Sequence, residues 1–346
     1  MNKNNTEIVI VQFGALCFFL STIEYLIPKP LPFFRLGLAN IPIMLAVDIL
    51  PVPSYCVLVL IKILGQGLIG GTLFSYVFLF SAAGTMSSAC VMFVLRKMLS
   101  GKISFLGIST AGAFASNIGQ LIMARLYIFG ENAWYVAPPF LIVGATTGAV
   151  LGLFTNRFAV NSLWYTDIRS GKIPLRQSTY DKTKIPANTQ TVSFLPNPVI
   201  RCCIGLVLLL ILMFVNVLIV RIILTVLSLL LVVADGSRLN PVSSGLTVAG
   251  IICVNLFSPF GRIYTSIAGF NITEGALFLG IKKALIFEGM IFISKWMLKP
   301  EFRLPGKSGL LISRTFNTLR QLTARQKSID FKNLISSIDS IMYELD

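Results

Sequence analysis

Long continuous apolar segments constrain this chain more than any other feature. Six lie before residue 160, at about 7–27, 36–51, 54–71, 73–95, 104–128 and 134–157, and four lie after residue 197, at about 198–215, 217–234, 242–258 and 276–298. A helix that crosses a bilayer needs roughly 20 apolar residues, whereas the strands of a membrane barrel alternate polar and apolar side chains. Helices also satisfy their own backbone groups in lipid. The segments therefore predict an all-α polytopic membrane protein.

The composition agrees with this prediction. Hydrophobic residues make up 55% of the 346 positions and charged residues only 12%, against about 25% charged in soluble domains. The formal net charge is +15, but most Lys and Arg lie between or after the apolar segments, as the positive-inside rule requires. We therefore interpret the charge as a signal for orientation in the lipid bilayer, with no nucleic-acid binding. The expected location is a bacterial cytoplasmic (inner) membrane, with both termini in the cytoplasm.

A polar interval at 161–196 divides the chain. It holds several Lys and Arg together with Ser, Thr and Pro, and such long connections are linkers or functional loops. We predict a six-span domain at 1–160, a cytoplasmic linker at 161–196 and a second domain at 197–346. Counting spans from the basic segments places Gly70–Gly71 outside the membrane and Lys295–Lys299 inside.

The end of the chain has a different pattern. Residues 308–346 mix apolar and charged side chains, and the apolar ones recur at a helical period: Phe331, Leu334, Ile335, Ile338, Ile341, Met342 and Leu345. We predict a cytoplasmic amphipathic helical tail. Its apolar stripe has three open interpretations, which are packing within the chain, lying on a membrane surface and docking a partner.

Several polar residues interrupt the apolar segments of the first domain. Side chains of this kind inside a membrane usually face a bundle interior or a cavity. The predicted topology places them at a similar depth, in the outer half of the membrane. Lys62 and Gln66 also share a helix face, because i and i+4 align. We predict an outward-opening pocket for a small solute, anionic or rich in hydrogen-bonding groups, formed by Arg35, Asn40, Lys62, Gln66, Asn117 and Gln120.

Alternatives stay open for some of these side chains. Arg35 and Arg125 can reach outer lipid headgroups, and Asn117 and Gln120 can form hydrogen bonds between helices. Runs of small residues such as GQGLIGGT (65–72) and GATTGAVLG (144–152) predict a bundle whose helices approach closely.

The residue types argue against most enzyme chemistry. The chain has no histidine and no C-x-x-C pair, which removes the common zinc and haem ligand sets. No adjacent Asp pair supplies the carboxylates that hold magnesium against a diphosphate. The PGKSG stretch (305–309) lacks the first glycine of a P-loop, because position 301 is Glu301. We predict no enzyme activity, no cofactor and no metal site.

Three stretches of the first domain carry a family resemblance: RLGLANI (35–41), LIKILGQGLIGGTLFSYVFLFSAAG (60–84) and AGAFASNIGQL (111–121). Over residues 7–158 they resemble the Gx transporter family, often labelled heptaprenyl diphosphate synthase component I. That family is similar to the substrate-binding S components of energy-coupling-factor (ECF) transporters, which implies six helices with cytoplasmic ends. The resemblance marks Arg35, Asn40, Asn117 and Gln120 as motif positions. Ser116 departs from it, because a histidine is expected there.

The second domain resembles a shortened ECF T component, the transmembrane coupling subunit. The similarity rests on LPNPVIR (195–201), ADG (234–236) and GFNITEGALFLGIKKAL (269–285). It implies that cytoplasmic helices engage ABC-type ATPase subunits through a short Ala-Arg motif. The corresponding positions are Arg314, Arg320, Ala324 and Arg325, although the family typically carries two such motifs and this chain has one.

Two functional hypotheses therefore follow. The first is a fused ECF-type transport protein that binds a solute from outside and couples to partner ATPases. The second is a membrane subunit of a flavin- or quinone-linked electron-transfer complex, with a flavin-carrying extracellular protein as partner, or an accessory protein in isoprenoid or quinone supply. The sequence does not identify the solute.

Overall fold

The computed structural model describes residues 3–26, 36–99, 102–172, 198–237, 239–267, 270–298, 306–325 and 333–343. Within these ranges, four apolar helical stretches are long enough to cross a membrane: Asn5–Tyr25, Val52–Ile69, Tyr76–Met98 and Phe105–Asn161. The strands of the described part form one two-stranded hairpin. The prediction of an all-α polytopic membrane protein is confirmed.

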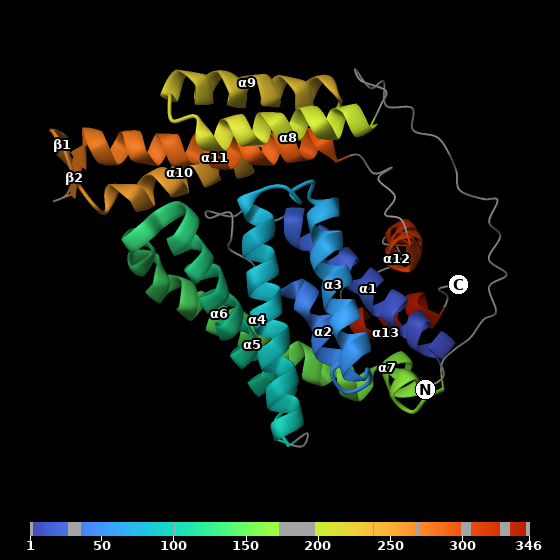
Figure 1. Cartoon of the computed structure of the whole chain (residues 1–346). Coiled ribbons are helices and arrows are strands. Elements are labelled where there is room, and N and C mark those ends of the chain that lie inside the picture. The colour runs from blue at the N-terminus through green and yellow to red at the C-terminus, as the bar shows by residue number, and fades with distance from the viewer. Residues whose placement is uncertain are drawn as a thin grey trace.

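The N-terminal domain is a bundle of long helices (Figure 1). They are α1 (Lys3–Leu26), α3 (Val52–Ile69), α4 (Tyr76–Met98), α5 (Phe105–Ala124) and α6 (Ala133–Asn161). A π-helical turn, η2 (Arg125–Phe129), and a 3-10 turn, η3 (Gly130–Asn132), join α5 to α6. Five of the six predicted spans of this domain are therefore present as long helices, with ends close to the predicted ones.

The second predicted span, 36–51, is wrong as a continuous helix. The chain instead forms a 3-10 turn, η1 (Leu38–Asn40), and a short helix, α2 (Ile41–Ala46). Pro42 lies at the start of α2, the position in a helix that best tolerates proline, because its missing N–H would have no partner in a preceding turn. Six residues at about 1.5 Å each cover about 9 Å, well short of a bilayer core of about 30 Å.

Glycines set the spacing between the long helices. A Cβ on Gly148 of α6 would lie 2.7 Å from the Cβ of Ala113, and one on Gly152 would lie 2.7 Å from the Cα of Leu106. On α3, a Cβ on Gly65 would lie 1.9 Å from the ring of Phe18 in α1. The close helix approach that the small-residue runs predict is therefore present.

Residues 163–169 of the predicted linker form a helix, α7 (Leu163–Arg169), that packs onto the first domain. Trp164 and Tyr165 are fully buried, and the Trp164 ring lies 5.3 Å from that of Phe13 in α1. The first domain therefore extends at least to Arg169. Residues 173–196 of the predicted linker lie outside the described residues.

The C-terminal domain has its four helices close to the predicted positions. They are α8 (Pro198–Phe214), α9 (Leu218–Ala234), α10 (Pro241–Leu256) and α11 (Glu274–Met297), and α11 packs against the other three. An antiparallel hairpin, β1 (Ile263–Ile267) and β2 (Phe270–Thr273), joins α10 to α11. Two motifs of the sequence meet here, because Arg201 of LPNPVIR forms a buried ion pair with Asp235 of ADG.

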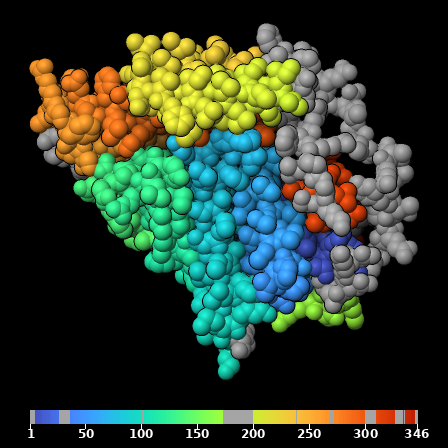
Figure 2. Space-filling model, in the orientation of Figure 1, coloured from blue at the N-terminus to red at the C-terminus, as the bar shows by residue number. Residues whose placement is uncertain are grey.

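The two domains cross steeply. In Figure 1, α8–α11 run across the ends of α3 and α4, and Figure 2 shows them as a separate layer in yellow and orange. The Phe80 and Phe287 rings stack at 6.5 Å between the domains. At one end of the interface Asn132 Nδ2 donates to the Val254 carbonyl over 3.3 Å, and at the other the Phe74 N–H donates to Ser294 Oγ over 3.0 Å.

This arrangement contradicts the predicted sidedness of two segments. The sequence places Gly70–Gly71 outside the membrane and Lys295 inside, but a Cβ on Gly71 would lie 2.8 Å from Cγ of Lys295. One point cannot lie on both sides of a bilayer, so the two assignments cannot both hold here. Because the helices of the two domains cross, they also cannot all lie along one membrane normal.

The tail returns to the N-terminal domain. Helix α12 (Gly306–Ala324) packs on α1, where the Phe316 and Phe18 rings lie 5.0 Å apart. Helix α13 (Leu334–Tyr343) packs on α7, and its Asp339 accepts hydrogen bonds from the Ser162 hydroxyl at 2.5 Å and the Leu163 N–H at 2.8 Å.

The apolar stripe of the tail packs within the chain, which is one of its three predicted interpretations. Ile341 and Met342 are buried in the core of the first domain, while Phe331 and Leu345 lie outside the described residues. Tyr343 donates a hydrogen bond to Asp167. Burial and this carboxylate raise the pKa of Tyr343 to about 12.

Candidate functional site

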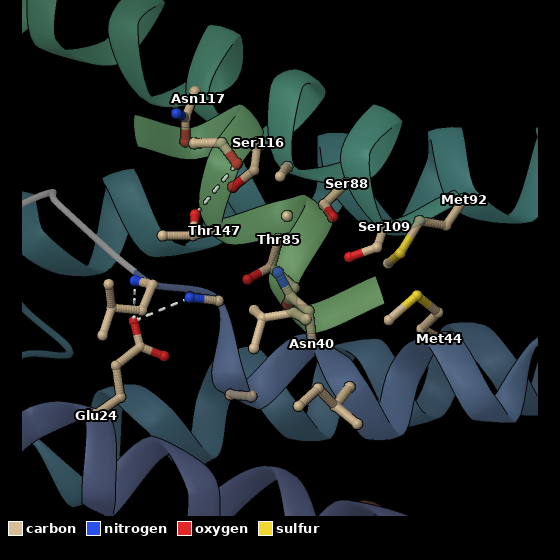
Figure 3. A pocket seen from close by; sticks show the side chains of 18 of the residues that line it. Glu24, Asn40, Met44, Thr85, Ser88, Met92, Ser109, Ser116, Asn117 and Thr147 are labelled. Carbon is tan, nitrogen blue, oxygen red and sulfur yellow. Dashed lines mark hydrogen bonds between the residues drawn. The ribbon is translucent and has the colours of Figure 1, made fainter. Parts of the chain in front are cut away.

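A pocket lies inside the N-terminal domain, between α1, η1, α2, α3, α4, α5 and α6 (Figure 3). It spans about 620 Å³ of space without protein atoms, part of which is open to solvent. A water-sized sphere fits into only a small part of that space, so a larger solute requires the side chains to shift. Five residues predicted from the sequence line it together: Asn40, Lys62, Gln66, Asn117 and Gln120. The sixth, Arg35, lies outside the described residues.

Lys62 lines the pocket from α3. Its side chain is only 3% exposed, and its ammonium donates to Asn40 Oδ1 at 2.7 Å and to Thr85 Oγ1 at 2.6 Å. A buried ammonium requires such partners because it has lost its hydration. The contacts join α3 to η1 and to α4, so this one side chain connects three elements around the pocket.

Gln66 lies one turn beyond Lys62, as the i, i+4 spacing predicts. Its Nε2 donates to Ser21 Oγ at 2.7 Å, and its Oε1 accepts from Ser81 Oγ at 3.1 Å. Gln66 also lines a smaller neighbouring pocket of about 430 Å³, together with Glu24, Tyr25 and others. Gln66 and Glu24 are therefore common to the walls of both pockets.

Glu24 supplies the acidic group of the pocket. Its Oε1 accepts from the N–H groups of Leu36 at 2.8 Å and Gly37 at 3.3 Å. Gly37 has a φ of +86°, a left-handed conformation that glycine adopts without strain. Glu24 is not among the residues that the sequence predicts for the pocket.

The two amides of α5 have different surroundings. Asn117 Nδ2 donates to the Phe140 carbonyl of α6 at 2.7 Å, so Asn117 forms the hydrogen bond between helices that the sequence leaves open as an alternative. Gln120 Nε2 donates to Ser116 Oγ of its own helix at 2.9 Å. Among the described residues, the buried Gln120 Oε1 and Ser88 Oγ have no hydrogen-bond partner.

The opposite end of the pocket is less polar. Figure 3 shows Met44 and Met92 there, close to the hydroxyls of Ser88 and Ser109. These residues, together with Thr85 and Thr147, were not predicted as site residues. On α4 a signal does exist, because Ser81, Thr85, Ser88 and Met92 recur at helical spacing on one face. Hydroxyl side chains are common in membrane helices, so this stripe alone does not distinguish a binding site from ordinary helix packing.

The predicted coupling residues lie on α12, away from the pocket. Arg314 lies on the side facing α1, with its Nη1 3.6 Å from Glu7 Oε2. Arg320 and Ala324 are exposed and Arg325 is half-buried, at the end of the helix. Within the described ranges, no three His, Cys, Asp or Glu side chains lie close enough to hold a metal ion together.

Two family models match the chain, one in each half. Residues 13–158 match the family model described as heptaprenyl diphosphate synthase component I. The N-terminal half of the chain matches this family, as its motifs predict. The match supports a membrane transport component of the Gx type, although the family description names a synthase component.

Residues 197–300 match a model described as a domain of unknown function, DUF8519. The resemblance of this half to an ECF T component therefore stays a prediction. No curated protein and no solved structure matches the chain.

Proposed function

We propose that the chain is an ECF-type membrane transport protein whose N-terminal bundle binds a small solute. One observation carries the proposal. Five polar residues from η1, α3 and α5 meet in one pocket, and two buried polar atoms on its wall, Gln120 Oε1 and Ser88 Oγ, have no partner among the described residues. An unsatisfied buried polar atom costs about 1–3 kcal/mol, so a bound solute that supplies the missing hydrogen bonds is favoured.

The chemistry of the walls restricts the solute. Gln120 Oε1 is an acceptor and requires an N–H or O–H donor from the solute. Lys62 and Glu24 offer opposite charges on different walls, and Met44 and Met92 offer an apolar end. The solute is therefore small, carries hydrogen-bond donors and places its apolar part between the two methionines.

We further propose how the protein is coupled to ATP hydrolysis. The C-terminal half acts as the coupling unit, and the exposed end of α12 at Arg320 and Ala324 is the surface for ABC-type ATPase subunits. Helix α12 rests on α1, one of the helices that line the pocket. Movement of α12 by a partner would therefore reach the pocket wall through one helix. We place the protein in a bacterial cytoplasmic membrane.

Pocket variants test the solute site. Asn117→Leu and Lys62→Met should abolish retention of the solute that co-purifies with the wild-type protein, because both remove polar groups of the wall. The solute is released by denaturation and identified by mass spectrometry, and thermal unfolding in detergent shows that each variant still folds.

A neighbouring pair on α6 provides a matched control. Thr147 lines the pocket and Thr146 is exposed, and both hydroxyls donate to the Val143 carbonyl. Thr147→Val should weaken retention of the solute, and Thr146→Val should leave it unchanged. Equal retention in Asn117→Leu, Lys62→Met and wild type would show that the site is wrongly placed.

A further inference from the structure

One acidic side chain in the C-terminal domain is buried and has few polar neighbours. Glu288 lies in α11 and is 5% exposed. Its neighbours Phe287, Gly289 and Met290 are buried as well, and α8, α9 and α10 pack around the helix. Acidic residues in such positions within a membrane protein are costly and usually functional.

The hydrogen bonds of Glu288 do not match those of an ionised carboxylate. Ser244 of α10 lies beside the carboxyl group and can bond one of its oxygens. The other oxygen, Oε2, is buried and has no hydrogen-bond partner among the described residues. An ionised carboxylate offers about four lone-pair sites, so most of them would be empty here.

Among the described residues, no cation of the surrounding helices forms an ion pair with Glu288. Arg201 of α8 pairs with Asp235 of α9, and Arg221 of α9 donates to Asn216 at 2.8 Å. On α11 itself, Lys283 donates to Asn255 at 2.9 Å. Lys295 lies two turns beyond Glu288 on the same helix face, and its positive charge acts on the carboxyl group. Its ammonium lies 5.6 Å from the centre of the Tyr25 ring.

Few other titratable groups belong to this bundle. Helix α10 contains no charged residue. The remaining titratable groups on the helices that contact α11 are Lys282, Glu274, Cys202, Cys203, Cys253 and, on α4, Tyr76, Cys90, Arg96 and Lys97. Lys282 lies six positions before Glu288, a spacing that does not share its face as i+3, i+4 and i+7 do.

Two other buried carboxyl groups provide a contrast. Glu24 accepts two backbone N–H groups, and Asp235 has the Arg201 guanidinium. Donors of this kind stabilise an ionised carboxylate. Glu288 has neither a backbone donor nor a paired cation in the described structure, so its surroundings differ from those of Glu24 and Asp235.

We propose that Glu288 is a proton-binding site of the C-terminal domain, neutral in the folded protein, whose deprotonation loosens the contact between α10 and α11. The group takes one proton from water, and no other bond changes. This site is independent of the solute pocket and of the proposed ATPase coupling, and the family matches assign it no role.

Dicyclohexylcarbodiimide tests this directly, because it enters membranes and reacts with protonated carboxyl groups. The acid O–H adds across a C=N bond of the reagent, and the product rearranges to a stable N-acylurea with all atoms retained. Peptide mass spectrometry of the labelled full-length protein should find one adduct at Glu288, with less labelling as the pH rises. Glu24 and Asp235 should stay unlabelled, and the Glu288→Gln variant should lose the adduct.

A stability measurement complements the labelling. A folded state that holds a proton which the unfolded chain releases loses stability as pH rises. Glu288→Gln keeps the shape of the neutral acid, so this variant should be at least as stable as wild type in detergent. Its stability should also fall less than that of wild type as the pH rises. An unlabelled Glu288 combined with an unchanged pH slope in Glu288→Gln overturns the proposal, and so does equal labelling of all three carboxyl groups.

Discussion

At the scale of single residues, spacing gave more information than residue type. The i, i+4 pair Lys62 and Gln66 could be placed on one face from sequence, and both line the pocket. For Asn40, the sequence predicted only a depth in the membrane. Its contact with Lys62 depends on the irregular η1 turn. Ser88, Met44 and Met92 could not be predicted as site residues, because their side chains are equally suited to ordinary helix packing.

Gly65 gives a prediction at this scale. Its Cα lies against the Phe18 ring, and an added Cβ would lie 1.9 Å from it. Gly65→Ala should therefore lower the free energy of unfolding by about 1–3 kcal/mol, the usual cost of overpacking a core. Thermal unfolding in detergent measures the change.

The Phe18→Leu variant tests whether the Phe18 ring causes this loss of stability. The smaller side chain removes part of the clash, so Gly65→Ala should cost less in a Phe18→Leu background than in wild type. Equal costs in both backgrounds would mean that the ring is not what excludes a side chain at position 65.

At the scale of elements, long apolar segments were predicted well and short irregular ones were not. The hydrophobic pattern located α1, α3–α6 and α8–α11 to within a few residues, because span length is set by the bilayer. The segment at 36–51 has the same apolar composition as its neighbours, yet Pro42 and Gly37 break it into η1 and α2. Helix α7 was missed because its seven residues lie in a polar interval.

The end of α12 carries the element-scale prediction. Arg320 and Ala324 are exposed there, so the double change Arg320→Glu and Ala324→Glu should reduce recovery of P-loop ATPase subunits with the tagged protein from its own membranes. Charge reversal opposes the proposed contact. Mass spectrometry identifies and quantifies the subunits that are recovered.

Ser313→Glu is the matched control for this test. Ser313 is exposed on the same face of α12, two turns before Arg320, so it adds an acidic group about 10 Å away from the proposed surface at the helix end. ATPase recovery that is the same for the double variant and for Ser313→Glu contradicts coupling through this end of α12.

At the scale of the whole molecule, the sequence contains no signal for how the two halves of the chain meet. Hydropathy and charge report how each helix relates to a membrane, and they contain no information about the angle between two bundles. The interface depends on specific pairs such as Phe80 with Phe287 and Asn132 with the Val254 carbonyl. Such pairs are far apart in the chain and have no local pattern.

A cross-link tests this arrangement. The Phe74 N–H donates to Ser294 Oγ, so cysteines at these two positions, in a chain whose six native cysteines are replaced, should form a disulfide in membranes. The cross-link appears as a band of altered mobility that reducing agent removes. Cysteines at Leu60 and Leu230, which are both exposed on helices of different domains, should form none, and the absence of a 74–294 cross-link contradicts the crossing of the domains.

The central claim is that the pocket around Lys62, Asn117 and Gln120 holds the solute. The most direct measurement is an electron cryo-microscopy map of the protein purified from its own membranes together with the solute that mass spectrometry identifies. We expect density between Gln120 and Lys62, with a donor group of the solute within hydrogen-bond distance of Gln120 Oε1. Density for that solute at any other place in the molecule would contradict the account.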